Sequence, residues 1–299
     1  MLQEYNPKNE HILVYINGAL LPRKEAKVSV FDSVVQGGDA VWEGLRVYNG
    51  RIFSLNRHLE RLQNSAHALA FRQVPDNEFI TQALFKTLQA NKMRDGVHIR
   101  LTLTRGEKIT SGMDPRLNQS GPTLIILPEW KPPVYPPEIT LITSSVRRNS
   151  PMFLDSKIHH NNLLNNILAK IEANHAGADA GIMLDKDGFV SEANGVNLFC
   201  VYKNVVYTPH ADSCLPGITR SLVIGLCREQ SIPVKEKNLS LTEFYTADEV
   251  FTTGTMGELT KVSAIDGRNI INKSGQSTLE KIQEHFRRMT ETSGTPLPF

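Results

Sequence analysis

Five prolines fall within the ten residues 128–137, and this segment limits the fold more than any other feature of the chain. Proline has no N–H donor and a fixed φ, so neither a helix nor a central strand continues through such a stretch. A stiff, extended connector is the structure that this composition favours. At 299 residues the chain also exceeds the usual size of one domain. We therefore predict a small domain at 1–127, a linker at 128–137 and a larger domain at 138–299.

Strand and helix patterns occur on both sides of this connector. Asn17-Gly18 and Asn49-Gly50 separate apolar runs and predict two hairpins. The strands expected from alternation or apolar runs are 12–16, 19–21, 41–48, 51–53, 98–104, 123–127, 139–143, 180–184, 196–202, 205–208 and 249–253. Helices are expected at 55–71, 78–90, 161–175, 216–230 and 277–290. The two kinds of element do not alternate regularly, which predicts an α+β fold with two domains.

Composition excludes several classes of partner. The 33 basic and 31 acidic residues are interspersed, so we expect no nucleic-acid or membrane partner. No apolar run approaches the roughly 20 residues of a membrane span, and the first ten residues do not resemble a secretory signal. The spacing of Cys200, Cys214 and Cys227 does not suit a metal, and H-E-x-x-H is absent. We expect no protein-bound metal and a reducing, cytoplasmic location.

Lys157 stands directly before a polar run rich in Asn and His, which then becomes a helical pattern. Most lysines are solvated surface residues, and that interpretation stays open here. A lysine that attacks a carbonyl instead needs a partly desolvated, hydrogen-bonded setting. The adjacent His159 and His160, if helical, point about 100° apart and do not form a metal-ligand pair.

Glu192 is a single acid placed just before a predicted strand. Two interpretations are open: an ordinary acid after the Asp187-Gly188 turn, or a carboxylate that pairs with a pyridinium nitrogen. Such a carboxylate keeps the ring nitrogen protonated, so that the ring can accept electrons from the substrate carbon. Together, Lys157 and Glu192 suggest the chemistry of pyridoxal 5'-phosphate, with the lysine as a Schiff base.

Three segments are candidates for binding a phosphate. The run 215–220 opens a helix with Gly217, Ile218 and Thr219, where backbone N–H groups favour an anion. The run 252–257, with Thr255 and Met256, follows a strand and offers hydroxyl groups and glycines. Each pattern is also common in helix caps and turns. Arg61 is a third candidate, and the alternative for a helical arginine is an ion pair with a neighbouring acid.

A substrate-binding face is predicted in the first domain. Strand alternation places Trp42, Gly44 and Arg46 on one face, and likewise pairs His98 with Arg100. Trp42 would contact an apolar side chain of a substrate and Gly44 would leave space for it. The arginines would bind a carboxylate of that substrate. A plain sheet face with a stacked tryptophan and solvated arginines is the alternative. Arg116, in the loop 112–116, is a further candidate for binding the carboxylate.

These motifs closely resemble the class IV (fold type IV) pyridoxal-phosphate aminotransferases, and especially the branched-chain aminotransferases and their branched-chain-aminotransferase-like relatives. The resemblance runs from about residue 14 to residue 288 and rests on 42–46, Arg61, the Lys157 segment, 192–199, 215–220 and 254–255. It implies a small α+β domain, a larger pseudo-barrel domain, a cofactor between them and a homodimer.

The resemblance also implies roles for individual residues. Lys157 would form the Schiff base and move the proton, and Glu192 would bind the pyridinium nitrogen. The phosphate would be held by Arg61, Ile218, Thr219 and Thr255. Backbone at Thr255 and Met256 would face the substrate carboxylate. The pocket would be lined by Trp42, Gly44, Arg46 and Arg100.

Three positions depart from the family pattern. Asn162 stands near the cofactor where a tyrosine is common, and Asn does not ionise near neutral pH. Gly37-Gly38 replaces an aromatic residue, and His98 replaces a tyrosine. The preferred reaction is transfer of an amino group from an L-branched-chain amino acid to 2-oxoglutarate. The alternatives are a D-amino-acid or (R)-amine transaminase, a lyase of the aminodeoxychorismate type, and a protein that binds the cofactor without catalysis.

Overall fold

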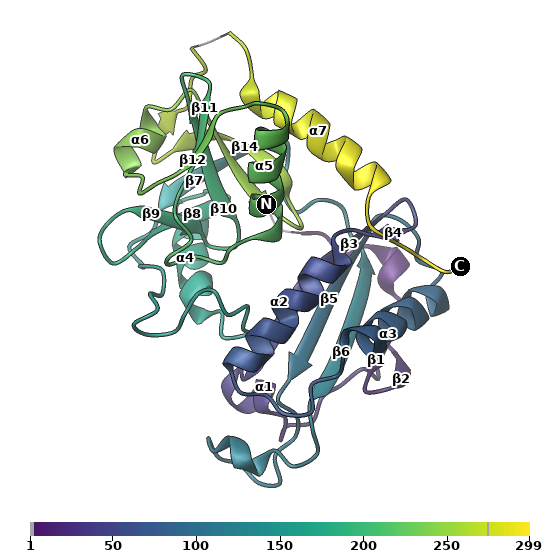
Figure 1. Cartoon of the computed structure of the whole chain (residues 1–299). Helices are drawn as coiled ribbons and strands as arrows, with labels where there is room; N and C mark the ends of the chain where they lie inside the picture. Colours follow the sequence, from purple (N-terminus) through teal and green to yellow (C-terminus); the bar gives the residue numbers. More distant parts are fainter. Residues whose placement is uncertain (1–2, 274) are drawn as a thin grey trace. The chain divides into compact units, whose positions relative to one another are not determined.

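The computed structural model describes residues 3–273 and 275–299, which form two compact units (Figure 1). The N-terminal unit comprises residues 3–132, Ile158–Asn162 and Thr290–Phe299. The C-terminal unit comprises Pro133–Lys157 and Leu163–Met289. The chain leaves the first unit inside the proline-rich segment. Two later stretches, which the sequence analysis assigns to the second domain, return to the N-terminal unit.

A seven-stranded antiparallel sheet forms the centre of the N-terminal unit, in the order β16-β4-β3-β5-β6-β1-β2. Its strands are β1 (Leu13–Ile16), β2 (Ala19–Pro22), β3 (Ala40–Tyr48), β4 (Arg51–Ile52), β5 (Val97–Thr104), β6 (Thr123–Trp130) and β16 (Thr295–Pro296). Both predicted hairpins are present, with positive φ at Asn17, Gly18, Asn49 and Gly50. These angles match the primed turns that suit the twist of antiparallel strands.

Two helices, α2 (Leu55–Ala68) and α3 (Asn77–Ala90), pack against one face of this sheet. The short elements of the unit are η1 (Pro7–Asn9), α1 (Ser33–Gly37) and η2 (Pro115–Leu117). The buried core contains Leu45, Leu59, Leu84, Ile99 and Ile126, among other apolar residues of the sheet and the two helices. Since strand residues alternate, the opposite face of β3 and β5 carries Trp42, Gly44, Arg46, His98 and Arg100.

The sequence interpretation of Pro128 as part of a connector is wrong, because β6 continues to Trp130 and pairs Pro128 with Ile99. On its other side β6 pairs with β1 only at Ile125 and Ile126. One edge of the strand is therefore open at Pro128. A proline is tolerated at such a position because no ladder hydrogen bond is lost there.

A nine-stranded mixed sheet forms the C-terminal unit, with the path β12-β11-β10-β13-β14-β7-β8-β9 and β15 paired to β14. Its strands are β7 (Glu138–Thr143), β8 (Ala180–Leu184), β9 (Val190–Ala193), β10 (Asn197–Tyr202), β11 (Val205–Thr208), β12 (Val234–Glu236), β13 (Glu249–Gly254), β14 (Glu258–Ile265) and β15 (Arg268–Asn269). Parallel pairs join β7 to β8 and β14, and β11 to β12. Phe199 and Phe251 stack on neighbouring strands, with ring centroids 5.0 Å apart.

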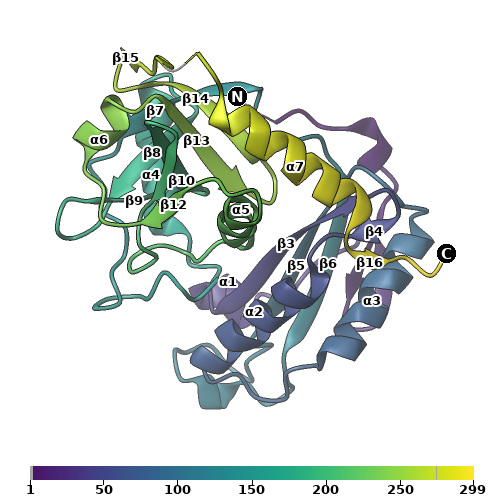
Figure 2. The same ribbon diagram turned by 45° about the horizontal axis from the view of Figure 1, so that its top comes forward.

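The helices of this unit are α4 (Leu164–His175), α5 (Ile218–Glu229), α6 (Leu241–Tyr245) and, apart from its end from Thr290 on, α7 (Thr278–Thr292). Figure 2 shows α5 beside β12 and β13. The Glu249 carboxylate accepts hydrogen bonds from the backbone N–H groups of Thr278 and Leu279 and so caps the start of α7. Within the described residues, no helix is long and apolar enough to span a membrane.

The predicted α+β fold is confirmed, but the predicted start of α4 is too early. The helix begins at Leu164 rather than at residue 161. Residues 159–161 instead lie along the open edge of β3, where Trp42 N–H donates to the His159 carbonyl (2.9 Å) and Asn161 N–H to the Ala40 carbonyl (2.8 Å). His159 and His160 are therefore not helical, so the argument from helical geometry does not apply to them.

Candidate functional site

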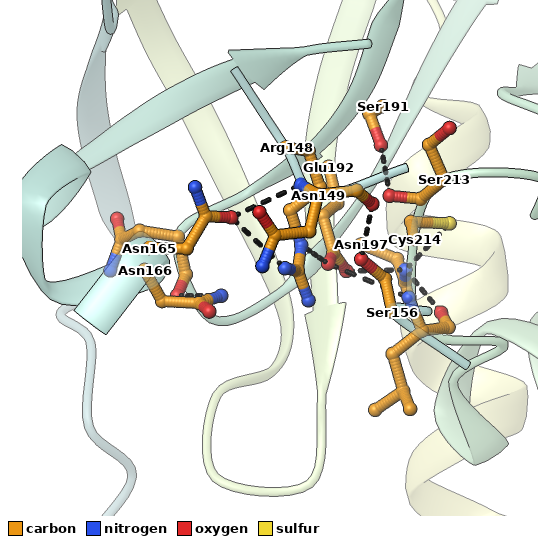
Figure 3. A network of polar contacts seen from close by, with 12 residues as sticks. Arg148, Asn149, Ser156, Asn165, Asn166, Ser191, Glu192, Asn197, Ser213 and Cys214 are labelled. Carbon is orange, nitrogen blue, oxygen red and sulfur yellow. Dashed lines mark hydrogen bonds and ion pairs between the residues drawn. The ribbon is translucent and has the colours of Figure 1, made fainter. Parts of the chain in front are cut away.

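Glu192, on β9, is a buried carboxylate within a network of polar contacts (Figure 3). Its Oε1 accepts from Arg148 Nε at 2.6 Å and from the Leu215 backbone N–H at 3.5 Å. Its Oε2 accepts from Asn197 Nδ2 at 3.2 Å. Only 6% of each side chain of the Arg148–Glu192 pair is exposed. Water screens such a pair little, so the guanidinium favours the charged form of the carboxylate.

The loop that carries Lys157 is tied to this ion pair. Ser156 Oγ donates to the Asn149 carbonyl at 2.6 Å, directly beside Arg148 (Figure 3). Asn165 Oδ1 accepts from Arg148 Nη1 at 3.1 Å and from Asn149 N–H at 3.2 Å. Lys157 itself lies in a turn, where its N–H donates to Asp155. The Lys157 side chain is exposed, which differs from the partly desolvated setting expected from the sequence.

The N-terminus of α5 is joined to the same cluster. Asn197 Nδ2 also donates to the Leu215 carbonyl at 2.9 Å. A Cβ added to Gly217 would lie 2.1 Å from Asn197 Oδ1, so only glycine fits there. Gly217 is the N-cap residue and has no side chain to accept from the first N–H groups of the helix. An anion is a favoured partner for those groups, and Ile218 and Thr219 are the first two residues of the helix.

The end of β13 adds polar groups near Asn197. Thr253 pairs with Asn197 in the β10–β13 ladder. Its buried Oγ1 has no hydrogen-bond partner among the described residues. Thr255 and Met256 follow β13, and the Met256 carbonyl accepts from Val134 N–H at 3.0 Å. A buried hydroxyl without a hydrogen-bond partner destabilises the folded chain. The Thr253 hydroxyl is therefore a candidate to bond a polar ligand.

The polar groups of the C-terminal unit fit pyridoxal 5'-phosphate. The groups that fit it are a buried carboxylate that can accept from a protonated ring nitrogen, uncapped helix N–H groups that can donate to a phosphate, and Lys157. Gly217 lets Asn197, which bonds Glu192, lie against the N-terminus of α5. The group for the ring nitrogen and the groups for the phosphate therefore lie in one cluster.

In the N-terminal unit, Glu43 is the centre of a second buried cluster. Its Oε2 accepts from His58 Nδ1 at 2.6 Å and Arg61 Nη2 at 2.7 Å. Its Oε1 accepts from Arg61 Nε at 2.8 Å and contacts His159 Nδ1 at 3.2 Å. Of the two interpretations of Arg61, the structure contains the ion pair, but with an acid on β3 rather than on its own helix. The phosphate role of Arg61 stays a prediction.

The protonation of this cluster follows from its burial. Burial alone would raise the pKa of Glu43, but His159, Arg61 and His58 outweigh it and hold that pKa well below its ordinary value. Burial lowers the pKa of His159 to about 4 and also lowers that of His58, against the opposing effect of Glu43. Both imidazoles are therefore neutral at pH 7. Since an ionised carboxylate only accepts, each Nδ1 carries the proton that it donates to Glu43.

The predicted substrate residues lie together on the open face of the sheet. Gly44 is opposite Arg100 and Arg46 is opposite His98 in the β3–β5 register. The Arg100 guanidinium carbon lies 3.3 Å from the centre of the Trp42 ring. Burial, with the charges of Lys131, Arg46 and Arg100, lowers the pKa of His98 to about 3, so this histidine is neutral.

The two remaining predicted residues lie outside these clusters. Arg116 is exposed in η2 and forms an ion pair with Asp114. Asn162 lies against Gly38, whose left-handed φ of 67° closes α1. The N-terminal unit therefore brings together Trp42, Gly44, Arg46, His98 and Arg100, but neither Arg116 nor Asn162.

Several residues of these clusters were not expected from the sequence, namely Glu43, His58, Arg148, His159 and Asn197. Glu43 lies within the motif 42–46, but strand alternation places it on the face opposite Trp42. Arg148 lies in a loop, where no periodic pattern marks a partner. Asn197 belongs to a motif used for the resemblance, and its position five residues after Glu192 was the available signal.

Comparisons with known proteins agree with this geometry. Residues 40–265 match the family model described as Amino-transferase class IV. The chain is 57% identical over 294 residues to Branched-chain-amino-acid aminotransferase-like protein 2 of Arabidopsis thaliana, covering 98% of this chain and 53% of that protein. It is 42% identical over 276 residues to a putative branched-chain-amino-acid aminotransferase of Methanocaldococcus jannaschii, covering 92% and 95% of the two chains.

Solved structures resemble the chain as well. The branched-chain aminotransferase of the thermophilic archaeon Thermoproteus uzoniensis, solved with norvaline, superposes with a TM-score of 0.87 at 30% identity. The match covers 94% of this chain and 95% of that one. By contrast, the chain spans about half the length of its Arabidopsis relative. The resemblance inferred from the sequence motifs is confirmed by these matches.

Proposed function

Because the chain belongs to the class IV aminotransferases, we propose that it transfers an amino group from an L-branched-chain amino acid to 2-oxoglutarate, with pyridoxal 5'-phosphate as its cofactor. The observation that carries the proposal is the buried Glu192 carboxylate, paired with Arg148 and bonded to Asn197. A charged, buried carboxylate can accept a hydrogen bond from a protonated ring nitrogen. The cofactor needs that protonated nitrogen so that its ring can accept electrons.

When bound, the cofactor supplies a carbonyl that takes the amino group and a ring that accepts electrons. We assign to Glu192 the role of keeping the ring nitrogen of the cofactor protonated. Lys157 is assigned the covalent bond to the cofactor and, through its Nζ, the proton transfer at the substrate carbon. The tie from Ser156 to Asn149 supports this assignment, because it anchors the residue before the lysine.

The phosphate is assigned to the backbone N–H groups of Ile218 and Thr219, to Thr255 and to Arg61. The uncapped N-terminus of α5 supports the first two of these assignments. Arg61 donates Nε and one Nη to Glu43, which fixes the plane of its guanidinium. Asn162 is assigned a position near the cofactor, in the place of the common tyrosine.

The substrate is assigned to the open sheet face with Trp42, Gly44, Arg46, His98 and Arg100, to Arg116, and to backbone at Met256. A neutral His98 supports a pocket that accepts an apolar side chain, because it adds no charge there. Arg116 belongs to the D-amino-acid alternative, since a loop cation would bind a carboxylate from another side.

We also propose a homodimer in the cytoplasm. Leu164, Ile167, Leu168 and Ile171 form an exposed apolar stripe on α4, near the exposed Met152 and Phe153 in sequence. Exposed apolar stripes often mark an interface, and two copies of the chain packed through this stripe would remove its apolar area from water. Three buried cysteines without disulfides support a reducing location. The particle mass in sedimentation velocity tests the dimer.

The test of the reaction is a half-reaction with the purified holoprotein. Its visible absorption is recorded, and L-leucine, D-alanine or an (R)-arylalkylamine is then added without an amino acceptor. We expect L-leucine to convert the bound cofactor to its amine form, seen as loss of the visible band. Conversion by D-alanine or by the amine alone would select an alternative donor instead.

The control is Lys157→Ala, loaded with the same cofactor. We expect it to lack the visible band of the covalently bound cofactor and to give no turnover, whether or not it retains cofactor noncovalently. Unchanged turnover in this variant would remove Lys157 from its role. No change in the wild-type spectrum with any donor would refute the transaminase assignment.

A further inference from the structure

His159 contacts two consecutive residues of β3 that point to opposite faces of the sheet. Its Nδ1 lies 3.2 Å from Glu43 Oε1, and its ring centre lies 4.1 Å from that of Trp42. Since side chains alternate along a strand, Trp42 lies on the open face and Glu43 on the face that α2 covers. One side chain can reach both only from the edge of the strand. His159 therefore joins the two faces of the sheet across the open edge of β3.

The backbone of His159 is fixed independently of its side chain. Its N–H donates to Ser65 Oγ of α2 at 3.1 Å, and its carbonyl accepts from Trp42 N–H at 2.9 Å. The bond from Asn161 N–H to the Ala40 carbonyl holds the same segment against β3. These bonds cover the edge of the strand whichever side chain stands at position 159. A contribution of the imidazole is therefore separate from the covering of this edge.

On the covered face, His159 fixes the orientation of a buried carboxylate. The Glu43 side chain has no exposed surface, and its Oε1 accepts from both His159 Nδ1 and Arg61 Nε. Its Oε2 accepts from His58 Nδ1 and Arg61 Nη2. Each oxygen thus has one imidazole donor and one guanidinium donor. Without the donor at His159 the carboxylate is freer to rotate, and the guanidinium bonded to it by two parallel hydrogen bonds turns with it.

On the open face, His159 supports the Trp42 ring, which is assigned to the substrate. The two rings are inclined at 36°. Trp42 Nε1 donates to the His160 carbonyl at 3.1 Å, which fixes one end of the indole. The imidazole packs against the indole, and such ring contacts stabilise beyond the area that they bury. Removal of the imidazole ring therefore leaves space into which the indole can move.

An imidazole combines the two properties that this position uses. It has a flat ring, and it carries the Nδ1 donor directly on Cγ. Burial lowers the pKa of His159 to about 4, so at pH 7 the ring is neutral and adds no charge beside Arg61. Asparagine has an amide donor on Cγ but no ring, and phenylalanine has a ring but no donor. These two substitutions therefore separate the two contacts.

We propose that His159 is a positioning residue with two separable actions. Its Nδ1 holds Glu43, and through it Arg61, in the orientation that binds the cofactor phosphate. Its ring holds Trp42 in place against the substrate side chain. The inference rests on the proposed function, which assigns Arg61 to the phosphate and Trp42 to the substrate. It extends that function because one residue, acting through different neighbours, affects the binding of both ligands.

The first experiment tests the action on Arg61. The whole chain, freed of cofactor, is titrated with pyridoxamine 5'-phosphate and with pyridoxamine, neither of which has the aldehyde needed for a Schiff base. We expect His159→Phe to bind the phosphorylated compound roughly tenfold more weakly and pyridoxamine about equally, because Arg61 is disturbed. His159→Asn keeps the donor and should stay within about twofold of the wild type for both. Unchanged binding in His159→Phe, or equal weakening for both compounds, would overturn this action.

The second experiment tests the action on Trp42 in the holoenzyme at saturating cofactor. His159→Asn should raise KM for L-leucine roughly threefold to tenfold, with kcat within about twofold, because the lost ring contact affects binding of the substrate side chain. His159→Phe keeps the ring and should leave this KM within about twofold. An unchanged KM in His159→Asn, or a fall in kcat alone, would overturn this action.

A fluorescence measurement separates the inference from the reaction. The chain has two tryptophans, so Trp130→Phe leaves Trp42 as the one reporter. In that background His159→Asn should increase acrylamide quenching of Trp42, whereas His159→Phe should not. Increased quenching without amino transfer in any variant would retain the positioning of Trp42 and refute the proposed reaction. Amino transfer with equal quenching in both variants would retain the reaction and refute the positioning.

The matched controls are His67→Phe and His67→Asn, at an exposed histidine of α2 in the same unit. Both should leave cofactor binding, KM for L-leucine and quenching unchanged. Losses of the same size in these controls would show a general effect of the substitutions and would refute the role of His159. A role of His159 in stability alone would weaken all three measurements in both of its variants together, and that result would also refute the inference.

Discussion

Each unit contains a buried glutamate bonded to an arginine, but the other partners of the two carboxylates differ in kind. Glu43 bonds two imidazoles, His58 and His159. Glu192 bonds the Asn197 amide and a backbone N–H. Imidazoles titrate near neutral pH once they are exposed, whereas amides do not titrate in this range. The glutamate–arginine pair thus has partners that titrate near neutral pH in the N-terminal unit and partners that do not titrate in the C-terminal unit.

The largest expected effect comes from breaking the pair at Glu192. Arg148→Met removes the guanidinium and leaves a carboxylate buried without its charge partner. We expect a loss of about 3 to 5 kcal/mol in the free energy of unfolding of the C-terminal unit. Denaturant unfolding followed by circular dichroism measures this loss.

The double variant Arg148→Met/Glu192→Gln is the control for that prediction. It removes both charges, so most of the lost stability should return. A loss of less than about 1 kcal/mol in the single variant would mean that the buried pair contributes little. Tryptophan fluorescence should change little in either variant, because both tryptophans lie in the N-terminal unit.

A smaller effect is expected from mild acid, through the buried histidines of the N-terminal unit. The pKa of His159 is lowered to about 4 and that of His98 to about 3, so in the folded chain both stay neutral well below their ordinary value of 6.5. The unfolded chain takes up these protons first. Stability is therefore full above about pH 6.5 and is lost as the pH falls toward 4. For His159 the loss from pH 7 to pH 5 is about 2 kcal/mol.

Unfolding followed by tryptophan fluorescence at several pH values checks this sign. His159→Gln should reduce the slope of stability against pH. His175→Gln, which replaces an exposed histidine at the end of α4, should leave the slope unchanged. A wild-type N-terminal unit that becomes more stable between pH 7 and pH 5 would contradict the assignment of neutral imidazoles.

The smallest effect should come from the tie beside Lys157. Ser156→Ala removes the hydrogen bond to the Asn149 carbonyl, which costs about 1 kcal/mol or less. Hydrogen exchange of residues 149–157 should become faster, while exchange in β3 and β5 should not change. Equal protection in the variant and the wild type would show that this bond does not anchor the loop.

The sequence was most informative where one signal determined one structure. The Asn-Gly hairpins and the α+β class followed from turn chemistry and periodicity, and the family followed from short motifs. The common face of the five substrate-side residues on β3 and β5 also followed from strand alternation. Once two antiparallel strands are paired in a given register, alternation determines which side chains share a face. Their roles stay predictions.

Contacts between distant segments could not be predicted in this way. The pairing of Arg148 with Glu192 joins a loop to a strand 44 residues later, and the contact of His159 with Glu43 spans 116 residues. Local pattern does not encode such separations. The late start of α4 has the same cause, since the edge of β3 competes for residues 159–161 and prevails over their helical propensity.

The N-terminal unit is assembled from three separate stretches of chain, and this affects how the protein is made on the ribosome. Trp42 bonds a residue 118 positions later, and Arg51 bonds the Gly294 carbonyl 243 positions later. The edge of β3 therefore stays open until residues 159–161 emerge, and the edge of β4 stays open until β16 emerges, after almost all of the second unit has been synthesised. The N-terminal unit therefore cannot complete its sheet before the second unit has been synthesised.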